Sequence, residues 1–141
     1  MKTVLPVAAA VIPAACSSSQ IKMVKPDEIG GIRHICIIEN YKVMPQMAQR
    51  LADALGEYGI SGEIVKPENK SRLYGGSCNY NLRYKGLVNT RGIEHINILI
   101  RTPDHEVGGI KYSRNMDKDF TANPDLGGQT RRVVGRLLGK Y

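Results

Sequence analysis

The stretch IRHICIIENYKVMPQMAQRLADALGEYGISGEIVK, residues 32–66, decides the fold of this chain. It opens with an Ile-rich apolar run, residues 32–40, that is typical of a strand buried on both faces. Residues 44–59 place apolar side chains at helical spacing, with a proline and a glycine suited to the two helix ends. Residues 62–66 predict a second strand. This order predicts a βαβ unit with parallel strands and a right-handed crossover.

The segments that follow are marked by regular alternation or spacing of apolar residues. Residues 78–86 and 93–102 alternate apolar and polar side chains, which predicts two half-buried strands. Residues 107–115 predict another strand, with a bulge at its pair of glycines, and residues 130–141 predict a C-terminal helix. The order β-α-β-β-β-β-α predicts an α+β fold, a two-layer sandwich in which two helices cover one face of a mixed sheet.

The N-terminus has the pattern of an export signal. Lys2 precedes an apolar run, and Ala14 and Ala15 lead into Cys16, which serines follow. These residues resemble the lipobox of bacterial lipoproteins. In that family the cysteine receives a diacylglycerol thioether, the leader is removed, and the new amine is acylated. The resemblance implies a lipid anchor on Cys16 as the only non-protein group, and Ser17 after the cysteine implies an outer-membrane lipoprotein that faces the periplasm.

The lipobox-like residues, the polar composition of the segment after them with Pro26 and Gly30-Gly31, and the strand and helix patterns divide the chain into three parts. Residues 1–15 are predicted to be a signal peptide, 16–31 a lipidated flexible tether, and 32–141 a single α+β domain. Pro13 stands where the lipoprotein family prefers leucine. Two alternatives therefore stay open: ordinary cleavage after Ala15, which would release a soluble periplasmic protein, and no cleavage at all.

The three cysteines divide into one anchor and one pair. If Cys16 carries lipid, Cys36 and Cys78 remain as an even pair in an oxidising compartment. A bridge between them would close a long loop and stabilise the fold by a few kcal/mol. Two buried free thiols fit the strand positions equally well, so both interpretations are kept.

The formal net charge of +7 permits attraction to an acidic partner. Export would remove the protein from most nucleic acid, which is therefore not expected as a partner. Four cations of the last helix form a candidate anion-binding face for lipid head groups or cell-wall carboxylates: Arg131, Arg132, Arg136 and Lys140. The alternative is a solvated face whose cations favour the C-terminal end of the helix dipole.

No pattern predicts catalysis or a metal site. The spacing of His34, His95 and His105 matches no compact ligand set, which favours structural or surface roles. The polar segment 115–128 lacks the spacing of a calcium loop, so its aspartates at 117, 119 and 125 are expected in a solvated loop. No local signature marks a nucleophile with its base, so we predict no enzyme, no metal and no cofactor other than the lipid.

A second resemblance lies in the middle of the chain. The run CNYNLRY, residues 78–84, followed by a meander and a terminal helix, is similar to a group of small bacterial envelope lipoproteins with a Tyr-x-Leu-x-Tyr strand. Tyr80, Leu82 and Tyr84 match that motif, although the tryptophan usual after it is missing. The group implies no activity.

The expected function follows from the anchor and the charge. We expect a lipid-anchored envelope lipoprotein that binds or assembles another envelope protein through its sheet edge or its 115–128 loop. The alternatives are a structural protein that contacts cell wall or anionic lipid through its basic surface, and a small hydrolase.

Overall fold

A computed structural model describes residues 19–23, 25–74, 76, 78–118, 120 and 125–140 of the chain. The strands are β1 Ser19–Met23, β2 His34–Ile38, β3 Ser61–Val65, β4 Asn81–Asn89, β5 Gly92–Arg101 and β6 Glu106–Ser113. The α-helices are α1 Pro26–Gly31, α2 Met47–Glu57 and α3 Leu126–Leu137, and the 3-10 helices are η2 Pro67–Tyr74 and η3 Arg114–Met116. The architecture confirms the predicted α+β fold class.

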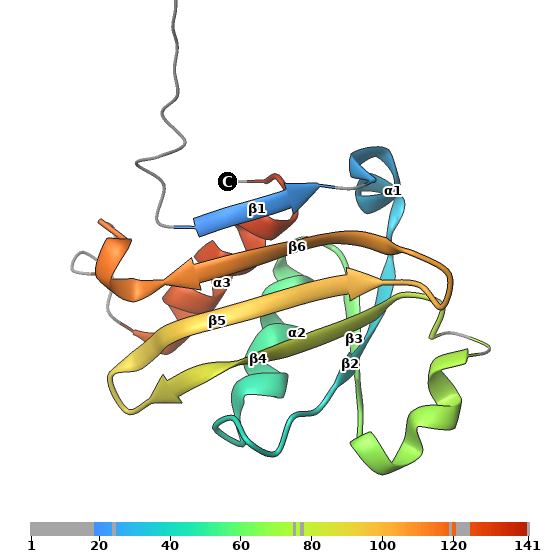
Figure 1. Cartoon of the computed structure of the whole chain (residues 1–141), viewed down its shortest axis with the longest axis horizontal. Helices are drawn as coiled ribbons and strands as arrows, with labels where there is room; N and C mark the ends of the chain where they lie inside the picture. Colours follow the sequence, from blue (N-terminus) through green and yellow to red (C-terminus); the bar gives the residue numbers. More distant parts are fainter. Residues whose placement is uncertain are drawn as a thin grey trace, which may run out of the picture.

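One mixed sheet organises these elements in the order β1-β6-β5-β4-β2-β3 (Figure 1). β2 pairs with β3 in parallel and also with β4 in parallel, whereas β4, β5, β6 and β1 form antiparallel pairs. The helix α2 connects β2 to β3, which confirms the predicted βαβ unit. A parallel pair needs such a crossover, and a helix is its usual form.

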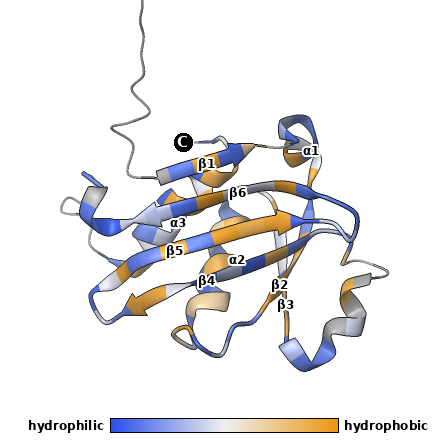
Figure 2. Ribbon diagram, in the orientation of Figure 1, coloured by the Kyte–Doolittle hydropathy of each residue, from blue (hydrophilic) through white to orange (hydrophobic). Residues whose placement is uncertain are grey.

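The two faces of the sheet differ in what covers them. α2 and α3 lie side by side behind the sheet in Figure 1, and they bury the apolar face of its strands. The predicted alternation of β5 holds, since Ile96, Ile98 and Ile100 are buried in this core. Orange and blue segments alternate along β4 and β5 in Figure 2, as expected for strands with one buried face. Neither α2 nor α3 covers the opposite face of β4, β5 and β6, which we call the open face.

The predicted tether is wrong for the two segments of 16–31 that form β1 and α1. β1 pairs with β6 in antiparallel register, and α1 places the buried side chain of Ile29 against the core. Pro26, which lies in the predicted tether, occupies the first turn of α1, where its missing N–H costs no hydrogen bond. The polar composition gave no sign of the strand β1, because an edge strand is held mainly by backbone pairing.

Two predicted details of the C-terminal half are also corrected. The bulge lies at Val107, since the pairing passes from Ile100↔Gly108 to Arg101↔Glu106. The adjacent glycines serve close approach, because a Cβ on Gly109 would lie 2.8 Å from the carbonyl oxygen of Ile98. The last helix begins at Leu126, before the predicted residue 130, because the Asp125 carboxylate accepts a hydrogen bond from the Gly128 N–H and caps it.

The predicted signal peptide and Cys16 lie outside the described residues. Within the described part of the chain, no helix has both the length and the apolar character that a membrane crossing requires.

Candidate functional site

The open face carries two rows of side chains that run across four strands. In an antiparallel sheet, residues directly opposite each other project from the same face. The register aligns Lys85 of β4 with Asn97 of β5, Asn97 with Lys111 of β6, and Lys111 with Gln20 of β1. In the first row, the two lysines therefore lie on either side of Asn97, whose side chain is an amide.

The second row lies two residues along each strand. It aligns Arg83 with Leu99, Leu99 with Gly109, and Gly109 with Lys22. Gly109 has no side chain and Leu99 is half-buried, so the middle of this row is low and apolar, with a cation at each end.

A groove of about 820 Å³ lies over these rows, and we call it the basic groove. Among the described residues that line it are the cations of both rows, with Glu106 as the acidic member. Glu106 pairs with Lys22 at 3.0 Å, but their side chains are 38% and 69% exposed, so solvent weakens this pair. In the described part of the chain, no ion pair involves Arg83, Lys85 or Lys111. An anion in the groove would meet a net positive field.

The aromatic residue among the groove-lining residues does not offer a stacking surface. Tyr84 is 5% exposed and belongs to the core, as the sequence pattern predicted. Its hydroxyl accepts a hydrogen bond from the Asn40 N–H at 3.1 Å, and burial raises the pKa of the Tyr84 phenol. Because single-stranded nucleic acids are typically held by stacking on exposed rings, Tyr84 gives the groove no such platform.

The four cations predicted as a face of the last helix are not brought together. Arg131 points toward α2, where its Nε lies 2.9 Å from a carboxylate oxygen of Glu57. Lys140 follows the helix and is exposed. Arg132 and Arg136 instead face the interior and meet a buried carboxylate. The structure thus divides the candidate anion-binding face between two sides of α3.

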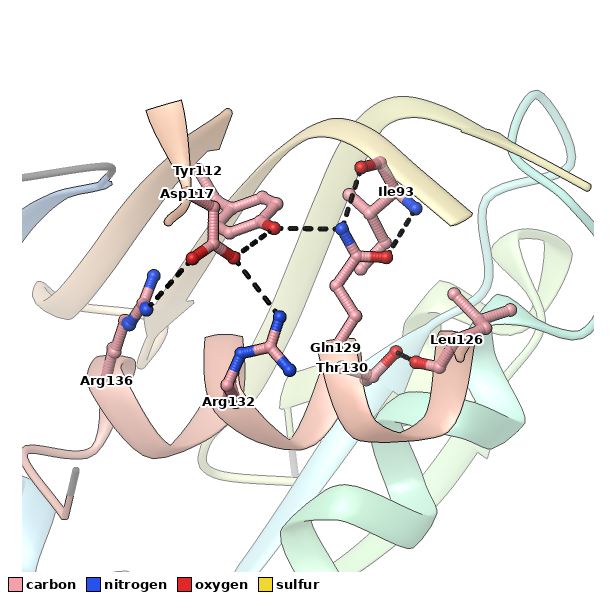
Figure 3. Close-up of polar contacts among 8 residues, drawn as sticks. All are labelled: Ile93, Tyr112, Asp117, Leu126, Gln129, Thr130, Arg132 and Arg136. Carbon is pink, nitrogen blue, oxygen red and sulfur yellow. Dashed lines mark hydrogen bonds and ion pairs between the residues drawn. The ribbon is translucent and has the colours of Figure 1, made fainter. Parts of the chain in front are cut away.

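That carboxylate belongs to Asp117, which is 6% exposed (Figure 3). Arg132 Nη2 lies 3.3 Å from its Oδ2, and Arg136 Nη2 lies 3.4 Å from its Oδ1. The Tyr112 hydroxyl donates to the same carboxylate at 2.5 Å, and burial raises the pKa of Tyr112 to about 12. The solvated-loop prediction is therefore wrong for Asp117. Its charge is compensated inside the protein, which makes it a structural group.

Gln129 extends this network to β5. Its side-chain amide donates to the Ile93 carbonyl at 2.9 Å and to the Tyr112 hydroxyl at 2.8 Å, and its oxygen accepts from the Ile93 N–H at 2.8 Å (Figure 3). Residues 129, 132 and 136 recur at helical spacing, so they share one face of α3. Polar residues at this spacing on one helix face are a sequence signal that the helix has a buried polar partner. They do not show that the partner is Asp117.

A second cluster lies beside β2 and β3. Cys36 and Cys78 form a disulfide with a Cα–Cα distance of 5.3 Å, and both are packed with Val65 and Leu73. This is the bridge that the sequence left open. The bridge connects β2 to the segment before β4. The alternation of residues 78–86 predicted that Cys78 shares a face with Leu82, but Cys78 packs in a separate cluster.

The three histidines lie apart, in different surroundings. The ring of His34 meets a carboxylate oxygen of Glu63 at 3.0 Å, and that of His105 meets Glu28 at 2.9 Å. His95 is exposed on β5. The hydrogen bonds from His105 and then from Tyr80 hold the pKa of Glu28 below its usual value of 4.5.

Comparison with known proteins shows similarity in fold. No family model and no curated protein matches the chain. Among solved structures, a single-substitution variant of PelC from Paraburkholderia phytofirmans, a dodecamer, superposes with a TM-score of 0.50 at 10% identity and covers 86% of this chain and 95% of its own. Another PelC dodecamer from the same organism gives a TM-score of 0.50 at 12% identity and covers 86% and 94%. At these identities the likeness concerns the fold alone.

Proposed function

We propose that this protein is a lipid-anchored cell-envelope lipoprotein that acts as a non-catalytic binding module. Its basic groove takes an acidic, extended segment of another envelope protein. The observation that carries the proposal is the alignment of Lys85, Lys111, Arg83 and Lys22 in two cross-strand rows beside a low apolar floor. Such a surface attracts carboxylates and accepts apolar side chains between them.

The compartment is supported by the cysteines. The lipobox-like residues before Cys16 specify export, and a disulfide between Cys36 and Cys78 persists in an oxidising compartment such as the periplasm. Two independent features thus favour the envelope as the working location.

The position of β1 restricts where the partner lies. Only residues 17 and 18 separate Cys16 from the first residue of β1. Even fully extended, this connection spans about 10 Å, so a lipid on Cys16 would hold the sheet edge close to the membrane. The partner segment would therefore be membrane-proximal.

The shape of the surface favours a chain over a bilayer. A flat membrane would touch the rims of the basic groove, whereas an extended acidic segment can lie along its floor. Leu99 and Gly109 leave room at that floor for apolar side chains of the segment.

The test is binding of a fluorescent oligoglutamate peptide to the domain from residue 19 onward, measured by anisotropy at low and physiological salt. The variant Lys85→Gln/Lys111→Gln should weaken binding by about tenfold, since each of the two lost ionic contacts contributes on the order of 0.7 kcal/mol. The variant Arg131→Gln/Lys140→Gln removes the same charge from α3 and the residues that follow it, and should leave the affinity near that of the wild type. Equal losses of affinity in the two variants would show that binding depends only on net charge, and would overturn the assignment of the groove.

Anionic lipid is the competing ligand in this design. Sedimentation with phosphatidylglycerol vesicles should show little binding of the unlipidated domain. Strong vesicle binding that Lys85→Gln/Lys111→Gln abolishes, with no binding of oligoglutamate, would instead assign the open face to the membrane surface.

A second candidate is self-assembly through the β1 edge. Ile21 and Met23 expose 45% and 38% of their surface on a strand that ends the sheet, and unpaired edges favour association between chains. The PelC chains of similar fold were solved as dodecamers. Light scattering of the eluting domain tests this: a mass above one chain that Ile21→Lys reduces to one chain supports assembly, and a monomer at all concentrations removes it.

A further inference from the structure

Three side chains with metal-binding atoms converge beside the disulfide, away from the basic groove. His34 and Cys36 are two residues apart on β2, so they project from the same face, and Glu63 of β3 is the direct neighbour of Cys36. The His34 Nε2 lies 3.0 Å from Glu63 Oε1, and the Cys36 sulfur lies 3.8 Å from the former and 3.7 Å from the latter. We call these residues the β2–β3 triad.

These separations resemble the edges of a zinc tetrahedron. Zinc bonds of about 2.3 Å to sulfur and about 2.1 Å to nitrogen and oxygen give ligand-to-ligand distances of about 3.4 to 3.6 Å. Each distance in the triad is therefore within about half an ångström of that geometry. Rotamer adjustments would bring the three atoms onto one ion without moving the strands.

The geometry points to a divalent metal site, of the zinc class, that the Cys36–Cys78 disulfide closes and reduction opens. In the oxidised protein the Cys36 sulfur is bonded to Cys78 and carries no negative charge, which leaves an imidazole and a carboxylate. Reduction by a dithiol delivers two electrons, breaks the S–S bond and yields two thiols, while the dithiol becomes a disulfide. When the metal binds, the Cys36 thiol loses its proton to solvent, and the thiolate, His34 and Glu63 coordinate the same ion.

The ligand atoms that already converge are those of the β2–β3 triad. The Cα of Cys78 lies 5.3 Å from that of Cys36, so a side-chain rotation after reduction can bring a second thiolate toward the same ion. One or two thiolates with an imidazole and a carboxylate form a ligand set that binds zinc in preference to calcium or magnesium.

Burial gives the site a dry interior and an entrance. Cys36 and Cys78 are 0% and 1% exposed and are covered by Val65 and Leu73. The side chains of His34 and Glu63 are 32% and 26% exposed, so an ion can enter from solvent between them. Two thiolates in an apolar cluster would be costly alone, and a dication would compensate that charge.

The decisive variant is Cys78→Ser, which removes the bridge and leaves the triad intact without any reductant. Titration with Co²⁺ should produce the near-ultraviolet thiolate-to-cobalt absorption, together with visible bands of a tetrahedral site, and Zn²⁺ should then displace the cobalt. Oxidised wild-type protein should show no such absorption. A Cys36→Ser/Cys78→Ser protein, which has lost the same bridge, should fold as Cys78→Ser does and should also lack this absorption.

Matched variants identify the other ligands. In the Cys78→Ser background, His34→Ala and Glu63→Gln should each weaken Co²⁺ binding by about tenfold or more, whereas His95→Ala, at an exposed histidine of β5, should not. If Cys78→Ser does not fold, wild-type protein reduced and freed of reductant provides the same titration. Absence of the thiolate absorption in the folded, bridge-free protein would overturn the proposal, as would unchanged affinity in both the His34 and Glu63 variants. Neither result depends on whether the basic groove binds an acidic segment.

Discussion

The two faces of β6 use charged and polar groups in opposite ways. Lys111 and Tyr112 are neighbours in sequence, yet Lys111 is exposed on the open face and Tyr112 is buried under α3. On the covered face, the Tyr112 hydroxyl, Asp117 and two arginines compensate one another. On the open face, the lysine and arginine heads of the basic groove project into solvent.

The difference separates charge that stabilises the fold from charge that is available for a partner. A buried ion is costly unless it is paired, so removing one member of a buried group leaves the others unfavourable. An exposed cation costs the fold little and retains its field for a ligand. Substitution on the two faces should therefore have unequal effects on stability.

The largest effect is expected for Asp117→Asn. The change keeps the shape of the side chain but removes the buried negative charge that faces the guanidinium groups of Arg132 and Arg136. Urea denaturation should show a loss of about 3–5 kcal/mol in the free energy of unfolding. Asp104→Asn, in the exposed β5–β6 turn, is the matched control and should change it by less than about 0.5 kcal/mol. A similar small change for Asp117→Asn would end the contrast between the faces.

The next effect is expected for Gln129→Leu. This substitution keeps a side chain of similar size but removes the hydrogen bonds that satisfy the N–H and carbonyl of Ile93, which is fully buried. A buried backbone group without a partner costs about 1–3 kcal/mol. Amide exchange should accelerate at Ile93 beyond the global change in stability. Uniform exchange across β5 would show that Gln129 acts only by packing.

The covered face also shows what sequence patterns can predict. The alternation in β5 and the helical spacing in α2 are local properties, so the βαβ unit and the core strands followed from them. The burial of Asp117 depends on Arg132 and Arg136 of α3, which lie 15 and 19 residues further along the chain and reach it only through packing. The polar side chains of the open face were visible in the alternation, but the alignment of Lys85 with Lys111 depends on strand register and bulges.

The N-terminal segments were missed for a related physical reason. β1 is short and its side chains are mostly exposed, so its stability comes from the backbone of β6 and not from an apolar pattern of its own. The disulfide, in contrast, was already one of two interpretations of the sequence. If one of the three cysteines carries the lipid anchor, the other two remain as a pair.

A smaller effect is expected at Glu28, a half-exposed group of α1 at the edge between the two faces. Hydrogen bonds from His105 and Tyr80 lower its pKa in the folded protein from the usual 4.5. A lowered folded pKa stabilises the protein above pH 4.5, and this contribution is lost as the pH falls through the folded pKa. Glu28→Gln should therefore be less stable than the wild type at neutral pH, and the difference should shrink in acid. Urea denaturation across this pH range measures both curves, and a constant difference would contradict the linkage.

The smallest effect on stability is expected for Lys85→Gln/Lys111→Gln. Because these lysines have no acidic partner among the described residues and share one row of the open face, their neutralisation relieves repulsion. The free energy of unfolding should rise by a few tenths of a kcal/mol at low salt, and the gain should disappear at high salt, where charges are screened beyond about 3 Å. Arg131→Gln/Lys140→Gln removes the same charge but breaks the pair with Glu57, so it should have the opposite sign. Thermal or urea unfolding at two salt concentrations distinguishes these signs. A loss above about 1 kcal/mol in the open-face variant would mean that the lysines stabilise the fold, and they would then not be available to an acidic segment.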